Sequence, residues 1–182
     1  MKYTPRILLA SLFFLLCSFA AGKWVLFENA AGKFKIEFPV KPQENVKSVN
    51  TPSGPMLMHI FMFDGDQAEE GNKLYLAMYS DYPEKVINSG KPKNIIDTFF
   101  NNAINGAVNN IHGTLVSVEK TSIKGYPGRS IKASFSNGKG NMDMRMYLVK
   151  NRIYTLEVGY QKGQLNTTSE QHFFNSFALT GK

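Results

Sequence analysis

Charged and aromatic side chains recur at alternate positions in the second half of the chain, where they could form a binding surface. The residues concerned are Lys132, then Asp143, Arg145 and Tyr147, then Thr155 and Glu157. Alternate residues of a β-strand share a face, so we expect these six on one side of a sheet, opposite Ile131, Met144 and Leu156. A guanidinium beside an aromatic ring suits a planar anion. We therefore predict a ligand-binding surface at Lys132, Arg145 and Tyr147.

Two other interpretations of this face stay open. Antiparallel sheets commonly leave one polar face in solvent, where cross-strand pairs such as Arg145 with Glu157 contribute about 0.2–1 kcal/mol each. Alternatively, Asp143 or Glu157 beside Arg145 could supply the acid and base of a small periplasmic hydrolase. A carboxylate with a raised pKa in a concave pocket would favour catalysis. If a helix covers the face, its charges must be paired or line a pocket.

Methionines form two further series at alternate positions, Met56, Met58 and Met62, then Met142, Met144 and Met146. Thioethers are soft ligands suited to Cu(I), which would make the chain a methionine-based copper-binding protein. Methionine also fills irregular cores. We expect this core role, because a predicted amphipathic helix needs an apolar sheet face to cover, and we predict neither a metal site nor a cofactor.

Known catalytic patterns are absent from the sequence. It contains no G-x-S-x-G, no G-x-x-x-x-G-K-[ST], no H-E-x-x-H and no C-x-x-C. Ser117 and Lys120 match S-x-x-K, but an odd separation within a strand sends them to opposite faces. The three histidines, His59, His112 and His172, lack metal-ligand spacing. We therefore predict no catalytic residue and a non-enzymatic protein.

The elements that position these residues are strands, one long helix, more strands and a closing helix. Apolar residues from Lys91 to Ile111, including Phe99 and Phe100, recur at helical spacing and predict a helix packed on a sheet. Strands are predicted at 24–27, 33–38, 56–63, 73–79, 114–123, 128–136, 141–149 and 152–160. Tight turns join the last four of these strands, which indicates that they form an antiparallel meander.

The closing helix begins at Thr167, with Glu170 at capping-box spacing. We expect it to bury three aromatic side chains, Phe173, Phe174 and Phe177. With no internal repeat or linker, these elements predict one α+β domain over residues 23–182.

Four features in this order resemble the PsbP/Mog1-like superfamily. They are a Phe-x-Ile-x-Phe-Pro strand at 34–39, a single long mid-chain helix, a Gly-Tyr-Pro-Gly corner at 125–128, and Phe-Phe-x-Ser-Phe at 173–177. The resemblance extends over nearly all of residues 23–182. It implies an antiparallel sheet flanked by helices, an α/β/α sandwich, in an accessory or binding protein. It brings no catalytic residues.

Residues 1–22 have the composition of a cleavable signal peptide. Lys2 and Arg6 precede an apolar run at 7–19 that is too short to span a hydrocarbon core of ~30 Å. Cleavage after Ala20 or Gly22 fits the small residues there. The mature chain then lacks Cys17, the single cysteine, so it has neither a disulfide nor a thiol. We expect a periplasmic or secreted protein without a transmembrane segment in the mature chain.

The positive charge is concentrated in the second half. The formal net charge is +7, and residues 119–182 hold 10 basic and 4 acidic side chains. In an exported protein this surface attracts anionic envelope components, and nucleic acid is not an expected partner. We predict an exported, non-enzymatic accessory or binding module of the bacterial cell envelope, whose partner is an envelope protein or an anionic ligand.

Overall fold

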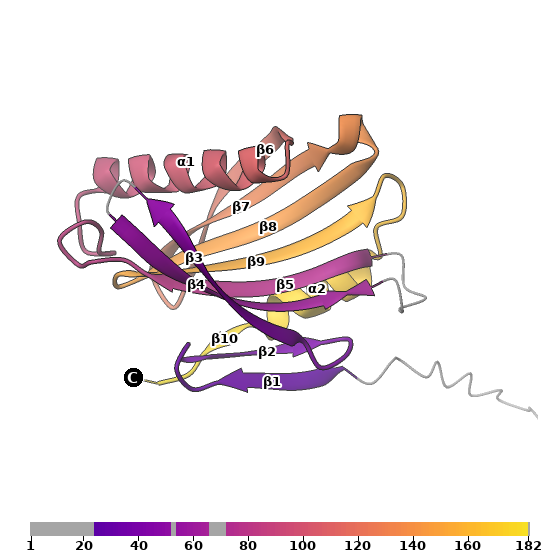
Figure 1. Ribbon diagram of the computed structural model, residues 1–182, viewed down its shortest axis with the longest axis horizontal. Helices are drawn as coiled ribbons and strands as arrows, with labels where there is room; N and C mark the ends of the chain where they lie inside the picture. Colours follow the sequence, from indigo (N-terminus) through magenta and orange to yellow (C-terminus); the bar gives the residue numbers. More distant parts are fainter. Residues whose placement is uncertain (1–23, 52–53, 66–71, 182) are drawn as a thin grey trace, which may run out of the picture.

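The computed structural model describes residues 24–51, 54–65 and 72–181, which form two antiparallel sheets and two α-helices (Figure 1). The predicted signal peptide lies outside the described residues. The large sheet has seven strands in the order β3-β4-β5-β9-β8-β7-β6, and the small sheet has three in the order β1-β2-β10. The predicted α+β class is confirmed.

The elements follow one another as expected, with two additional strands. Before the long helix come β1 (Val25–Asn29), β2 (Phe34–Phe38), β3 (Gln43–Thr51), β4 (Gly54–Asp64) and β5 (Asn72–Asp81). From the helix onward they are α1 (Lys93–Asn110), β6 (Thr114–Ile123), β7 (Tyr126–Phe135), the short 3-10 turn η2 (Ser136–Gly138), β8 (Gly140–Val149), β9 (Arg152–Gln161), α2 (Thr167–Ser176) and β10 (Ala178–Leu179).

The helix α1 covers one face of the large sheet at the end formed by β6 to β8 (Figure 1). Every fourth residue of α1 is buried, in the series Ile96, Phe100, Ile104 and Val108. These side chains share a core with Ile131, Ala133, Met142, Met144, Met146 and Leu148. The β8 methionines therefore fill the core beneath the helix, as predicted, whereas Met56, Met58 and Met62 of β4 are half-buried.

The opposite face of the large sheet is covered by α2 and the small sheet. Phe34, Ile36 and Phe38 of β2 are buried there with the three aromatic residues predicted for the closing helix, Phe173, Phe174 and Phe177. From the large sheet, the same core receives Tyr75, Tyr79, Tyr154, Leu156 and Val158. The two helices thus lie on opposite faces of the sheet, which confirms the sandwich of layers.

The register of β8 against β9 differs from the prediction. Arg145 lies opposite Leu156, and Glu157 lies opposite Met144. Directly opposite residues share a face, so Glu157 and Thr155 lie on the α1 face while Arg145 lies on the α2 face. A register shift of one residue moves every side chain of a strand to the other face. The predicted pairing of Arg145 with Glu157 is therefore wrong.

Two further local features differ from expectation. Strand β3 was not predicted, because its side chains are mostly exposed and lack the apolar alternation of a half-buried strand. The N-cap of α2 is Asn166 rather than Thr167, and its side chain accepts a hydrogen bond from the Ser169 amide at 3.1 Å. Glu170 is consequently not needed for capping.

Within the ranges that the structure describes, neither helix combines the length and the apolar character needed to cross a bilayer.

The packing of α1 predicts unequal roles for its two adjacent phenylalanines. Phe100 is 0% exposed, whereas Phe99 is half-buried beside Tyr82, with ring centroids 5.0 Å apart. Phe100→Ala should lower the free energy of unfolding by about 3–5 kcal/mol, the usual cost of truncating a buried aromatic residue. Phe99→Ala should cost clearly less. Urea denaturation of both variants measures this, and equal losses would contradict the packing.

Candidate functional site

The helix α2 lies over the charged side chains of β7 and β8 and encloses a pocket with them. The pocket has a volume of about 350 Å³. The lining residues that matter for its chemistry are Lys132, Asp143, Arg145, Leu165, Glu170 and Phe174. We call this the α2 pocket. Because a helix covers the face, its charges must be paired or turned toward the opening.

Arg145 is the cation of the α2 pocket that lacks an acidic partner. Its guanidinium carbon lies 4.6 Å from the centre of the Phe174 ring, and Nη1 donates to Asn175 Oδ1 at 3.3 Å. No carboxylate among the described residues comes within ion-pair distance of it. The stacking orients the plane of the guanidinium, and its other N–H groups remain able to bind a ligand.

Asp143 is the buried anion of the pocket, with 4% of its surface exposed. Its carboxylate lies 3.3 Å from the Lys132 ammonium, and the Tyr160 hydroxyl donates to it at 3.0 Å. These contacts offset the cost of burying a charge. Lys132 is 58% exposed and reaches Asp143 from the rim of the pocket.

Glu170 completes a carboxyl pair with Asp143. Burial of its side chain, the hydrogen bond with Asp143 and the charge of Asp143 together raise the pKa of Glu170 to about 7, while Lys132 and Arg145 oppose the shift. Below this pH Glu170 is protonated, and above it Glu170 adds a negative charge to the pocket. Sequence reasoning missed Glu170 because the capping-box spacing gave it another role.

The three predicted ligand-binding residues are therefore not all in one place. Lys132 and Arg145 line the α2 pocket, but Tyr147 does not. Tyr147 is buried in the core and stacks on Phe177, with ring centroids 6.0 Å apart and planes 3° from parallel. Phe174, and not the predicted Tyr147, provides the aromatic surface of the pocket.

Glu157 lies on the α1 face, away from the α2 pocket. It is 8% exposed, between Leu76 and Met144 in the sheet. None of the hydrogen bonds or ion pairs among the described residues involves its carboxylate. Burial raises its pKa to about 7. The predicted use of Glu157 with Arg145 as an acid and base is excluded by this position.

No cluster of three or more His, Cys, Asp or Glu side chains suited to a metal ion occurs in the described part of the chain. The histidines lie on separate elements. His59 of β4 stacks on Tyr79, and His172 of α2 lies 2.7 Å from a Glu37 carboxylate oxygen. The two methionine series lie on strands β4 and β8, which β5 and β9 separate.

Comparison with known proteins shows the fold. No protein-family model and no curated protein matches the chain. Among solved structures, the solution structure of cyanobacterial PsbP (CyanoP) from Synechocystis sp. PCC 6803 is similar, with a TM-score of 0.57 and 10% identity, over 89% of this chain and 95% of that chain. A Pseudomonas aeruginosa protein of unknown function has a TM-score of 0.35 and 10% identity, over 82% of this chain and 90% of that one. The fold is PsbP-like.

The burial of Glu157 predicts that stability falls as the pH rises. Its pKa goes from a usual 4.5 to about 7 on folding, so the folded state holds a proton that the unfolded chain has released. The free energy of unfolding therefore decreases between these two pH values. Glu157→Gln removes this titration, so its stability relative to the wild type should rise by about 3 kcal/mol from about pH 5 to about pH 8.

Urea unfolding across this pH range measures the difference. Glu119→Gln, at an exposed position of β6, is the matched control and should leave the wild-type profile unchanged. Parallel profiles for the wild type and Glu157→Gln would show that the carboxylate is solvated.

Proposed function

We propose that this chain is an exported, non-enzymatic binding module of the bacterial cell envelope, and that its α2 pocket binds a carboxylate group of a small ligand or an envelope protein. The export part of the proposal rests on the composition of residues 1–22. The binding part rests on one observation, the Arg145 guanidinium that lines a pocket without a carboxylate partner among the described residues.

The chemistry of the pocket favours a planar anion. A guanidinium presents parallel N–H donors that match the two oxygens of a carboxylate. Phe174 holds the plane of Arg145, and among the described residues Asn175 occupies only one of its nitrogens. Lys132 adds a second positive charge at the rim. Leu165 and Phe174 supply apolar surface for the carbon atoms of the ligand.

A hydrolase is the second candidate, and one observation favours it. Glu170 has a raised pKa in a concave pocket and is hydrogen-bonded to Asp143, which is an arrangement suited to general acid–base catalysis. Against this, Asp143 is already bound by Lys132 and Tyr160 as well as by Glu170. An ionic and hydrogen-bonded network of this kind accounts for the buried carboxylate without a reaction.

Binding of glutarate, a small dicarboxylate, tests the proposal. We expect NMR titration to perturb the Arg145 side-chain and Phe174 signals. Arg145→Ala should weaken the affinity by about 10- to 100-fold, the range for a hydrogen bond to a charged group. Lys162→Ala removes the same charge outside the pocket and should have little effect. Equal losses in both variants would mean that only the net charge attracts the ligand.

The pH dependence separates binding from catalysis. Glu170 ionises as the pH rises through about 7, which adds a negative charge to the pocket, so the affinity for glutarate should fall over this range. At low pH, Glu170→Gln should bind glutarate as tightly as the wild type does. At high pH, the affinity of this variant should not fall. A hydrolase would instead lose activity in Glu170→Gln, and an unchanged pH profile for glutarate in this variant would contradict the proposed site.

A further inference from the structure

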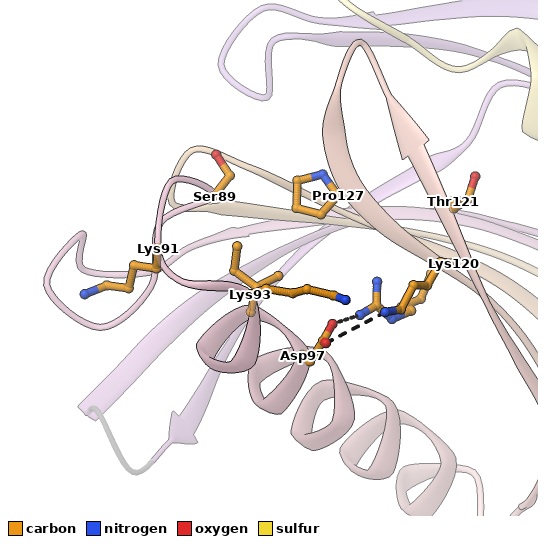
Figure 2. A pocket seen from close by; sticks show the side chains of 9 residues that line it. Ser89, Lys91, Lys93, Asp97, Lys120, Thr121 and Pro127 are labelled. Atoms are coloured by element: carbon orange, nitrogen blue, oxygen red, sulfur yellow. Dashed lines mark hydrogen bonds and ion pairs between the residues drawn. The ribbon is translucent and has the colours of Figure 1, made fainter.

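A second pocket lies on the α1 face of the large sheet, where α1 begins beside β6 and β7 (Figure 2). Its volume is about 320 Å³. Four cationic side chains line it, Lys91, Lys93, Lys120 and Arg129, against one carboxylate, that of Asp97. We call this the α1 pocket. It shares no lining residue with the α2 pocket.

Arg129 is the buried cation of the α1 pocket. It is 6% exposed, and its guanidinium carbon lies 4.5 Å from the centre of the Phe100 ring. Nη1 donates to the Gly128 carbonyl at 2.7 Å, while Nη2 pairs with the Asp97 carboxylate. A cation buried in this way is held in one orientation, because a ring, a carbonyl and a carboxylate each constrain it.

The other cations of the pocket are only partly neutralised. Asp97 is paired with Arg129 and lies 3.8 Å from the Lys120 ammonium, so one carboxylate serves two cations. In Figure 2 the Lys93 side chain extends toward this group, whereas Lys91 points away from it. Neither lysine makes an ion pair within the described ranges. The pocket therefore keeps an excess of positive charge that an anion would offset.

Ser89 and Thr121 also line the pocket, but in Figure 2 their hydroxyl groups point away from the Lys93, Lys120 and Asp97 side chains. The donors that approach one another are therefore cationic, and they come from the first residue of α1, Lys93, and from β6 and β7, Lys120 and Arg129. Three cationic groups with several N–H donors suit an anion with several acceptor oxygens and more than one negative charge, such as phosphate.

We propose that the α1 pocket binds a phosphate group, with Lys93 and Lys120 neutralising its charge and Arg129 anchoring one of its oxygens. The phosphate could belong to a free phosphate compound or to an anionic lipid headgroup, since both present the same oxygens. This site is independent of the carboxylate site in the α2 pocket.

Binding of inorganic phosphate and of phosphatidylglycerol vesicles tests the site on the folded chain. The test variant is Lys93→Gln/Lys120→Gln, which changes two exposed residues and keeps the Arg129–Asp97 pair. The matched control is Lys139→Gln/Lys162→Gln, which removes the same charge at two exposed positions outside the pocket. We expect phosphate to shift the NMR signals of Lys93, Lys120 and Arg129, and the test variant to lose affinity at least about tenfold.

The vesicle arm identifies the source of the phosphate. Cosedimentation with phosphatidylglycerol vesicles, but not with phosphatidylcholine vesicles, that is lost in the test variant and kept in the control supports a lipid headgroup. Phosphate binding without cosedimentation supports a free phosphate compound. If neither probe binds, or if the control pair loses as much affinity as the test pair, the proposal is overturned.

Discussion

The two-residue turn between β8 and β9 sets the chemistry of both faces of the large sheet. It pairs Val149 with Arg152 and thereby fixes which side chains of the two strands lie opposite each other. The turn is held in place from outside. Asn151 Nδ2 donates to the Tyr82 carbonyl at 2.6 Å, the Tyr82 amide donates to the Asn151 carbonyl at 2.9 Å, and the Ser89 amide donates to the Lys150 carbonyl at 2.8 Å. This anchoring ties the register to the segment that leads into α1.

With this register, each face combines a core with a charged pocket. On the α2 face, Asp143 and Arg145 lie beside the aromatic core and are covered by α2. On the α1 face, the methionines of β8 pack under α1. Arg129 lies on this face too, because it is opposite Met146 in the pairing of β7 with β8. Burial next to apolar side chains restricts the charged groups and lowers the local dielectric. Both pockets therefore hold their key cations in fixed orientations, and this supports a binding role for each.

Local patterns in the sequence predicted most of the elements, because α1 and the meander have regular apolar periodicity and short turns. They could not predict β3, whose side chains are mostly polar and exposed. The sequence placed Lys132 and Arg145 on one face correctly, because they lie on neighbouring strands, but the one-residue error in register put Glu157 on the wrong face. Glu170 of α2, and Lys91 and Lys93 at the start of α1, come from elements distant in the sequence. Only the packing of the helices on the sheet brings them to β7 and β8, so no local spacing could have revealed them. Lys120 differs, because it lies opposite Arg129 in the β6–β7 hairpin.

Helix α2 closes over the charged face and makes Asp143 and Glu170 an interacting pair. A carbon-13 NMR titration of the side-chain carboxyl groups tests it most directly, in the wild type and in Asp143→Asn. We predict that Glu170 titrates with a pKa of about 7 in the wild type and that its pKa falls in Asp143→Asn, because the hydrogen bond to a charged neighbour is weakened. A wild-type Glu170 that titrates at its usual value of 4.5, with no response to Asp143→Asn, would contradict the closed pocket.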